Sequence, residues 1–285
     1  MSEDRFSRTR LLYGKAALEK LAASRVAVFG VGGVGGYVVE ALARSGVGAL
    51  DLIDHDTVSL SNINRQILAT DSTVGRLKVE VAAERIRDIN PDCQVRTFPI
   101  FFLPETRDQF CFSDYDYVVD AIDTVTGKLA IIEYAKEAGV PVISAMGAGN
   151  KRNPAAFEVA DLFQTSVCPL AKVMRRECRK RGIKDLKVVY SREEPLRPLP
   201  DEVMKETREE FPDVNMPDTQ KTPAEEGGFG MKRRSLPGSV AFAPSVAGLI
   251  MAGEIVNDLT RDLWPQSSNL AAQQTDPCHN GGDSV

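Results

Sequence analysis

The loop between residues 54 and 78 carries side chains of the types that bind a triphosphate. Arg65 can form paired hydrogen bonds with phosphate oxygens, and Lys78 supplies a point charge for negative charge that develops in a reaction. Asn62 can bind phosphate or ribose without adding charge. A nicotinamide dehydrogenase has no special need for these three residues here. Taken singly, however, each of these residues is also typical of a solvated loop. The surrounding sequence must therefore show whether they form a binding site.

A glycine-rich loop precedes these residues and supports the same chemistry. The motif G-x-G-x-x-G follows an apolar run and opens a helical pattern, so backbone N–H groups at a helix N-terminus can approach phosphates. Asp54 comes 19 residues after the last glycine of the motif, where a carboxylate can bind ribose hydroxyls. The motif predicts nucleotide binding but does not choose between ATP and a dinucleotide. Its glycines are Gly30, Gly32, Gly33 and Gly35.

Alternating apolar runs and helical patterns predict the fold that positions these loops. We expect strands at residues 25–29, 49–54, 94–98, 117–121 and 141–144. Helical patterns cover residues 14–22, 34–45, 76–89 and 126–138. Such alternation is typical of an α/β, Rossmann-like fold, with a mostly parallel sheet and helices on both faces.

The second half of the chain departs from this alternation. We expect a C-terminal strand-helix extension, with a strand at 239–242 and a helix from Pro244, which suits a first helical position, to about Leu259. Residues 192–237 are rich in proline and charge and are predicted to be a mobile insertion. Residues 264–285 read as a disordered tail, which leaves one domain at 1–263.

Composition limits the classes of protein to consider. The 285 residues carry a net charge of −5, which argues against a surface that coats nucleic acid indiscriminately. Five cysteines without a C-x-x-C pair favour neither a disulfide scaffold nor a structural zinc site. We expect a cytoplasmic protein without a membrane partner, because no signal peptide or membrane-spanning stretch is visible.

An ordered set of motifs resembles the ThiF-type adenylating superfamily, which includes ubiquitin-activating enzymes and activators of sulfur-carrier proteins. Five signals in order are much more specific than the glycine loop alone. They are Gly30 to Gly35, the strand-end Asp54, S-N-x-x-R-Q at Ser61 to Gln66, G-x-x-K at Gly75 to Lys78, and D-A-x-D at Asp120 to Asp123.

This resemblance implies that ATP activates a carboxylate, giving an acyl adenylate and pyrophosphate. It implies that Asn62, Arg65 and Lys78 contact phosphates and that Asp123 works with Mg²⁺. The family also supplies an arginine from an N-terminal segment of a partner subunit, which implies a homodimer. Arg8 matches that position best, and Arg10 is the competitor.

A strongly basic segment lies between Lys172 and Lys187. It holds eight basic and two acidic residues, a net charge of +6 inside a chain whose remainder carries −11. Several of these cations share one helix face by i, i+3 and i+4 spacing, whereas a solvated helix usually mixes both signs. We therefore expect an anionic partner, with RNA as the natural candidate. The predicted RNA-binding residues are Lys172, Arg175, Arg176, Arg179 and Lys180.

Further segments resemble the tRNA threonylcarbamoyladenosine dehydratases: Arg5-Phe6, Leu12 to Gly14, Asp161-Leu162, Pro169 to Arg176, Val188 to Ser191 and Ser239 to Pro244. This resemblance implies an ATP-dependent cyclisation of N6-threonylcarbamoyladenosine in tRNA through an acyl adenylate. It leaves open which tRNAs are used, whether a sulfur-transfer partner assists, whether a monovalent ion binds, and what residues 192–237 do.

Two other functions remain as alternatives. An activator of a ubiquitin-like or sulfur-carrier protein would need Cys168 or Cys178 for a thioester, and neither is marked as a nucleophile beyond the basic neighbours of Cys178. Such activators usually carry paired C-x-x-C zinc ligands, which this chain lacks. A NAD-dependent oxidoreductase is the second alternative, although no catalytic constellation around His55 or His279 is evident.

Overall fold

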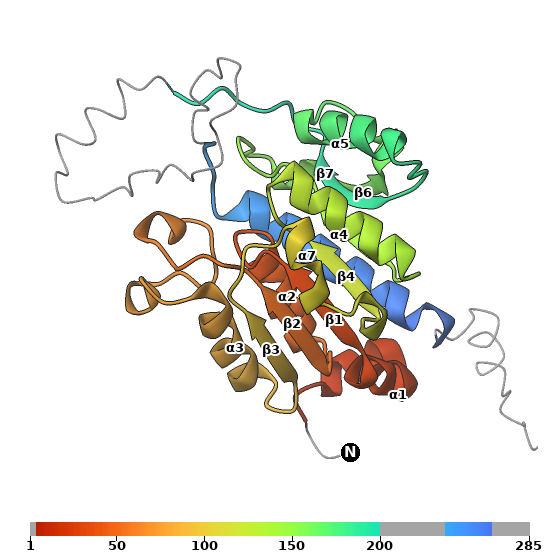
Figure 1. Cartoon of the computed structure of the whole chain (residues 1–285). Coiled ribbons are helices and arrows are strands. Elements are labelled where there is room, and N and C mark those ends of the chain that lie inside the picture. Colours follow the sequence, from red (N-terminus) through yellow and green to blue (C-terminus); the bar gives the residue numbers. More distant parts are fainter. Residues whose placement is uncertain (1–3, 200–236, 264–285) are drawn as a thin grey trace, which may run out of the picture.

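A computed structural model describes residues 4–199 and 237–263 (Figure 1). In these ranges seven strands form one sheet in the order β3-β2-β1-β4-β5-β7-β6. Neighbouring strands are parallel, except that β6 and β7 are antiparallel. The strands are β1 (Arg25–Phe29), β2 (Ala49–Ile53), β3 (Gln94–Phe98), β4 (Tyr117–Asp120), β5 (Val142–Ala145), β6 (Phe157–Asp161) and β7 (Lys187–Ser191).

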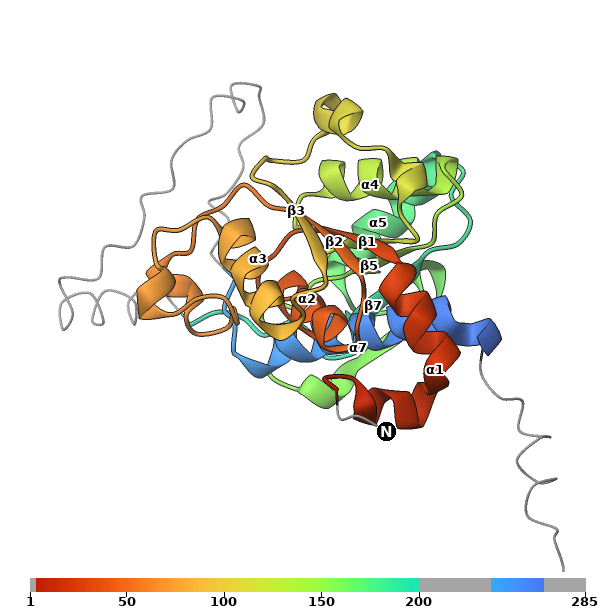
Figure 2. The same ribbon diagram turned by 90° about the horizontal axis from the view of Figure 1, so that it is seen from below.

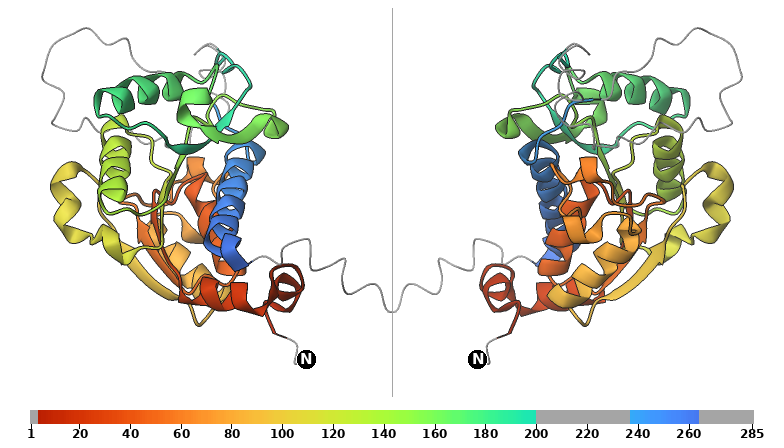
Figure 3. Two further views of the ribbon diagram at one scale, coloured as in Figure 1. Left: turned by 90° about the vertical axis from the view of Figure 1, so that its right-hand side faces the viewer. Right: turned by 90° about the vertical axis from the view of Figure 1, so that its left-hand side faces the viewer.

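Helices cover both faces of the sheet, as two perpendicular views show (Figures 2 and 3). One apolar core lies under α1, α2, α3 and α7, and a second lies under α4 and α5. In the described part of the chain, no helix combines the length and apolar character needed to cross a bilayer. The helices are α1 (Ser7–Ala23), α2 (Gly35–Arg44), α3 (Lys78–Ile89), α4 (Val125–Glu137), α5 (Pro169–Lys180) and α7 (Phe242–Thr260).

The predicted α/β class is confirmed, and each of the five strands expected between residues 25 and 144 is present within one residue of its predicted ends. The strand expected at 239–242 is wrong. Residues 237–240 form a loop, and helix α7 already begins at Phe242, so Pro244 is its third residue. A short apolar run of this kind cannot be told from the start of a buried helix by periodicity alone.

Two strands and part of a helix were not predicted. Strands β6 and β7 extend the sheet past β5, and their antiparallel pairing joins Phe157 to Ser191 and Asp161 to Lys187. Helix α1 begins at Ser7, earlier than expected, and Gly14 interrupts it with a φ of +81°. Most of the predicted mobile insertion (200–236) and the predicted tail (264–285) lie outside the described residues.

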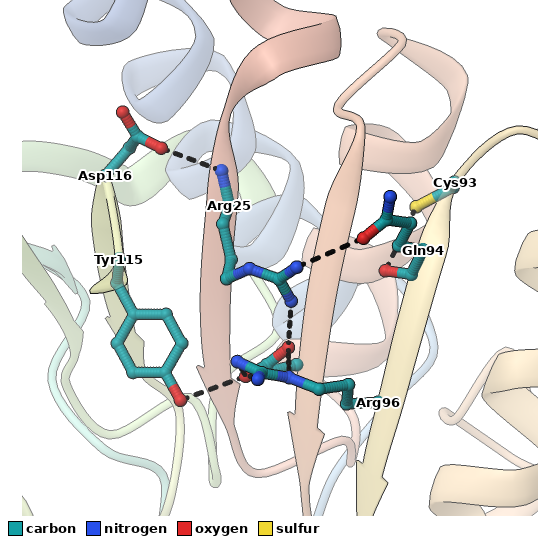
Figure 4. Close-up of polar contacts among 7 residues, drawn as sticks. Arg25, Cys93, Gln94, Arg96, Tyr115 and Asp116 are labelled. Carbon is teal, nitrogen blue, oxygen red and sulfur yellow. Dashed lines mark hydrogen bonds and ion pairs between the residues drawn. The ribbon is translucent and has the colours of Figure 1, made fainter. Parts of the chain in front are cut away.

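The fully buried carboxylate of Asp51 joins three neighbouring strands, β1, β2 and β3. Asp51 of β2 accepts hydrogen bonds from Arg25 of β1 at 2.8 Å and from the Nε of Arg96 of β3 at 2.9 Å (Figure 4). The hydroxyl of Tyr115 donates a third bond, at 3.0 Å. Burial and the adjacent carboxylate raise the pKa of Tyr115 well above its usual range, so this hydroxyl keeps its proton. The two cations offset the cost of burying the Asp51 charge.

Replacing Asp51 with Asn should therefore lower the free energy of unfolding by about 3 kcal/mol, because two guanidinium groups lose their counter-ion. Urea unfolding followed by circular dichroism measures this change. Asp92→Asn, at an exposed site, is the control and should stay within about 0.5 kcal/mol of the parent protein. Equal unfolding midpoints for the two variants would contradict a stabilising role for this cluster.

Candidate nucleotide site

A cavity of about 580 Å³ opens at the carboxyl ends of the central parallel strands. Its walls come from the segments that follow β1, β2, β3, β4 and β5, together with the loop 237–239 and Pro244 of α7. Ligands of open α/β sheets bind at this edge, where strand order reverses. The predicted nucleotide-binding loops therefore meet in one place.

The glycine motif divides into two pairs with different tasks. Gly30 has a φ of +88°, and a Cβ on it would lie 2.7 Å from the carbonyl oxygen of Ala121. A Cβ on Gly35 would lie 1.8 Å from the carbonyl oxygen of Gly30. These two glycines allow the close packing of strand, loop and helix, and Gly35 does not line the cavity. Gly32 and Gly33 do line it, so they leave the backbone open to a ligand.

Asp54 fixes the shape of this loop and faces the cavity. One carboxylate oxygen accepts the N–H of Val31 at 2.7 Å, and the other accepts the N–H of Asp56 at 2.9 Å. The carboxylate therefore joins the end of β2 to the glycine loop beside it. Each oxygen keeps a second lone pair, so the predicted bonds from ribose hydroxyls remain available.

Lys78 is held at the first position of α3, and its side chain is only 5% exposed. Its ammonium group donates to Asp56 at 2.6 Å, and its backbone N–H donates to the carbonyl of the same residue at 3.0 Å. The other carboxylate oxygen of Asp56 lies 3.2 Å from Nε2 of His55. The sequence placed Lys78 at the site but did not predict this acidic partner.

Arg65 and Asn62 stand on the short turn that follows β2. The guanidinium of Arg65 donates to the carbonyl of Ser61 at 2.8 Å and to the side chain of Asn64 at 2.9 Å. No carboxylate pairs with it within residues 4–199 and 237–263. Desolvation lowers the pKa of Arg65, yet arginine keeps its charge in proteins. Asn62 is buried, and its side-chain oxygen accepts the N–H of Ser59.

Asp123 lies on the wall that follows β4, and its side chain is exposed to the cavity. The structure thus brings together seven of the predicted site residues besides Asp123: Gly30, Gly32, Gly33, Asp54, Asn62, Arg65 and Lys78. Arg8 does not line the cavity. It is exposed on α1, which contributes no residue to the cavity wall.

The sequence interpretation missed several lining residues. Gln66 closes the S-N-x-x-R-Q motif, and Thr124 follows Asp123. Both could have been found because each stands next to a residue that the sequence had already assigned to the site. Phe101 lies against His55, with ring centroids 4.7 Å apart and planes at 85°. Ser239, in the region mispredicted as a strand, accepts a bond from the side chain of Asn64 at 3.1 Å.

The predicted RNA-binding residues lie on α5, away from the cavity wall. Lys172, Arg176, Arg179 and Lys180 are exposed, and the guanidinium of Arg179 lies 5.3 Å from the ring centre of Phe163. Arg175 is different, because its guanidinium bonds the carbonyl of Thr165 at 2.9 Å.

Glu177 pairs with three basic side chains on or next to α5: Arg176, Lys180 and Arg181. These cations lower the pKa of Glu177 to about 2, so the carboxylate is ionised at neutral pH and the three ion pairs partly neutralise the segment.

Comparisons with known proteins identify the family of this chain. The ThiF family matches residues 6–279. The tRNA threonylcarbamoyladenosine dehydratase of Bacillus subtilis is 44% identical over 259 residues, which are 90% of this chain and 95% of that protein. The Escherichia coli protein of the same name is 44% identical over 61% of this chain and 65% of its own length.

Solved structures of the Escherichia coli dehydratase, TcdA, in complex with ATP and with AMP resemble this fold. Each has a TM-score of 0.73 at 32% identity, covering 95% of this chain and 96% of the solved chain. The fold and site therefore define an adenylating protein of the ThiF family, to which this chain belongs. Within that family it belongs with the tRNA threonylcarbamoyladenosine dehydratases.

The glycine geometry predicts a sharp difference between two Gly→Ala substitutions. Gly35→Ala forces its Cβ against the carbonyl of Gly30, and overpacking of this kind costs about 1–3 kcal/mol. This strain distorts the glycine loop that faces the nucleotide, so the affinity for ATP should drop by about 10-fold or more. Gly253→Ala on α7 meets nothing within 4 Å, so it should bind ATP normally and gain up to about 1 kcal/mol of stability.

Calorimetric titration with ATP and thermal unfolding of both variants measure these effects. Unchanged ATP affinity in Gly35→Ala would show that the close approach of Gly30 and Gly35 does not shape the binding loop.

Proposed function

We propose that this chain uses ATP to cyclise N6-threonylcarbamoyladenosine in tRNA. A carboxylate oxygen of the threonyl group attacks the α-phosphorus of ATP, and pyrophosphate leaves. A nucleophile of the same modified side chain then attacks the activated carbonyl carbon, a ring closes and AMP leaves. The nucleoside loses one water in total, and the intramolecular attack benefits from high effective molarity. We place this activity in one domain, residues 1–263, and in the cytoplasm.

The observation that carries the proposal is the meeting of glycine loop, cation and amide donors in one cavity. Arg65 and Lys78 lie where phosphate oxygens and the leaving pyrophosphate gain negative charge, and Asn62 adds an uncharged contact. Asp54 holds the ribose, and the open backbone of Gly32 and Gly33 receives the phosphates. These groups hold ATP in position and neutralise the negative charge of its phosphates, and these are the main tasks of the protein in this reaction.

Mg²⁺ is proposed to enter with ATP and to be held by Asp123. The other two carboxylates that line the cavity are already engaged, Asp54 by two backbone N–H groups and Asp56 by Lys78. Asp123 is the lining carboxylate whose oxygens have no such bond among the described residues. Carboxylate together with phosphate oxygens is the ligand set that Mg²⁺ prefers, and the ion supplies charge neutralisation when bound.

Neither Cys168 nor Cys178 supports a thioester-forming activator. Cys168 is buried at the start of α5 and Cys178 is buried within it. Burial raises the pKa of Cys178 to about 11, so its thiol stays protonated at neutral pH. Cyclisation needs no enzyme thiol, since the second nucleophile belongs to the substrate.

A homodimer in which Arg8 enters the partner's cavity accords with the exposed face of α1. Leu11 and Leu12 on that helix are 77% and 82% exposed, which is unusual for two adjacent leucines. A second copy of the chain would cover them and would bring Arg8 toward a triphosphate. Arg10 is less suited to this role because it pairs with Asp4 of its own chain.

The exposed cations of α5 are proposed to bind tRNA phosphates. Glu177 neutralises part of this surface, so Lys172 and Arg179 are the exposed cations of α5 that have no carboxylate partner among the described residues. Arg175 is assigned a structural task instead, because its guanidinium holds the loop at Thr165.

Mass spectrometry of nucleosides tests the reaction directly. Incubation of the protein with ATP, Mg²⁺ and tRNA that carries threonylcarbamoyladenosine should convert this nucleoside to a species lighter by one water. Lys78→Ala should slow both this conversion and ATP–pyrophosphate exchange by about 100-fold or more, because a charge that stabilises the transition state is lost. Absence of the lighter nucleoside with the parent protein would contradict the proposed substrate. Full exchange by Lys78→Ala would contradict the site.

Charge removal on α5 tests the RNA surface separately. Lys172→Ala with Arg179→Ala should weaken tRNA binding by about 10-fold and reduce the slope of log K against log salt by about 1–2. Arg87→Ala removes an exposed cation of α3 and serves as the control, with affinity and slope unchanged. Filter binding at several salt concentrations measures both quantities. A parallel loss in the control would show that net charge alone controls binding.

A further inference from the structure

Two buried side-chain oxygens have no hydrogen-bond partner in the described part of the chain: Oε1 of Gln66 and Oγ1 of Thr124. Both residues line the nucleotide cavity, on different walls. Nearly all buried polar groups in native proteins are hydrogen-bonded, because an unpaired one loses its interactions with water and gains nothing. Such atoms therefore mark places where a bound molecule completes the bonding.

Thr124 occupies a position where its hydroxyl would ordinarily cap a helix. It is the N-cap of α4, and the side chain of an N-cap threonine usually accepts an N–H from the first turn. Here the hydroxyl makes no such bond. The Thr124 side chain therefore bonds none of the N–H groups in the first turn of α4, which is the positive end of the helix and lies next to Asp123. Its hydroxyl is free to act as a donor.

Gly127, which lies in the first turn of α4, leaves space for the Thr124 hydroxyl and the Ile122 side chain. A Cβ at this position would lie 2.9 Å from Oγ1 of Thr124 and 2.6 Å from Cδ1 of Ile122. The absence of a side chain at residue 127 thus keeps the Thr124 hydroxyl and the neighbouring wall of the cavity in place.

Gln66 presents an acceptor from the opposite side. The residue is 7% exposed, its Nε2 lies 3.7 Å from the position of a Cβ on Gly32, and its oxygen has no donor. Phosphate oxygens of ATP accept hydrogen bonds at neutral pH and cannot satisfy another acceptor. With the amide in this orientation, the missing partner of Oε1 is an N–H or O–H group of a ligand.

We propose that Thr124 and Gln66 are ligand-binding residues of this cavity. The Thr124 hydroxyl donates to a phosphate oxygen of magnesium–ATP beside Asp123. Gln66 accepts a hydrogen bond from an N–H or O–H group, which is offered either by the nucleoside part of ATP or by the threonylcarbamoyl group of the tRNA. The inference rests on the proposed function, and it assigns to that site two contacts beyond those proposed for Asn62, Arg65 and Lys78.

Thr124→Val tests the first contact, because it removes the hydroxyl at nearly constant shape. The variant should unfold at the same or a higher temperature than the parent protein, since an unpaired buried oxygen is gone. Its affinity for magnesium–ATP should fall by about 10-fold, the size expected for a hydrogen bond to a charged group. Thr124→Ser keeps the hydroxyl and should bind ATP within about twofold of the parent.

Thr165→Val is the matched control, because that hydroxyl is buried but already donates to the carbonyl of Leu162 at 2.6 Å. This variant should unfold at a lower temperature and bind ATP normally. Opposite signs of the stability change in the two Thr→Val variants separate a ligand contact from a structural one. Parent-like ATP affinity in Thr124→Val would overturn the assignment of Thr124.

Gln66→Met tests the second contact and should also unfold at the same or a higher temperature. Weaker binding of ATP places the donor on the nucleotide. A fall in kcat/KM for tRNA with normal ATP binding places it on the threonylcarbamoyl group. Both parameters unchanged would overturn the assignment of Gln66.

The outcome is distinguishable from a failure of the proposed function. If the parent protein binds ATP but does not dehydrate the tRNA nucleoside, the substrate is wrong, and the Thr124 variants still report on the phosphate contact. If the parent protein dehydrates tRNA and the Thr124→Val and Gln66→Met variants match it in ATP binding and kcat/KM, the function stands and this inference fails.

Discussion

The close approach of three backbone segments at the ends of β1 and β4 is the constraint on which the site depends. The carbonyl of Gly30 occupies the space where Gly35 would carry a Cβ, and the carbonyl of Ala121 occupies the corresponding space at Gly30. Because these segments touch, the turn that follows β4 is held against the glycine loop. Asp123 is thereby placed on the cavity wall opposite the loop that follows β2, and phosphate groups can lie between them.

This constraint also explains how far the sequence could be interpreted. In a parallel sheet all carboxyl ends lie at one edge, so motifs that follow successive buried strands meet without any further information. Asp54, Lys78 and Asp123 could be assigned to one site for this reason. Strands β6 and β7 were harder to find, because they pair antiparallel at the end of the sheet and β6 has only one buried residue, Phe157. Each of these strands is stabilised by its partner strand some 30 residues away. The periodicity of a single segment carries no information about such a partner.

Most ion pairs could not be predicted from the sequence, for a related reason. An ion pair depends on which side chains the folded chain brings within 4 Å, and spacing along the sequence fixes this only within one helix. Glu177 could be matched with Lys180 on α5, but the ion pair of Asp56 with Lys78 required the tertiary structure, and so did the hydrogen bond from Arg175 to the carbonyl of Thr165. Residue type therefore predicted which cations would line the cavity, Arg65 and Lys78, but not which carboxylate each of them meets in the folded chain.

The resulting charge balance shapes how a nucleotide can enter. Three carboxylates line the cavity, at Asp54, Asp56 and Asp123, against the cations Arg65 and Lys78. Lys78 already has a counter-ion at 2.6 Å, so a triphosphate must share or displace Asp56 to reach the ammonium group. A cavity balanced in this way repels a bare polyanion more than one that arrives with a divalent cation. These acidic side chains oppose the entry of free ATP, and a divalent cation carried by the nucleotide would offset that repulsion. Arg65 has no carboxylate partner among the described residues, so its guanidinium is available to a phosphate without the loss of an ion pair.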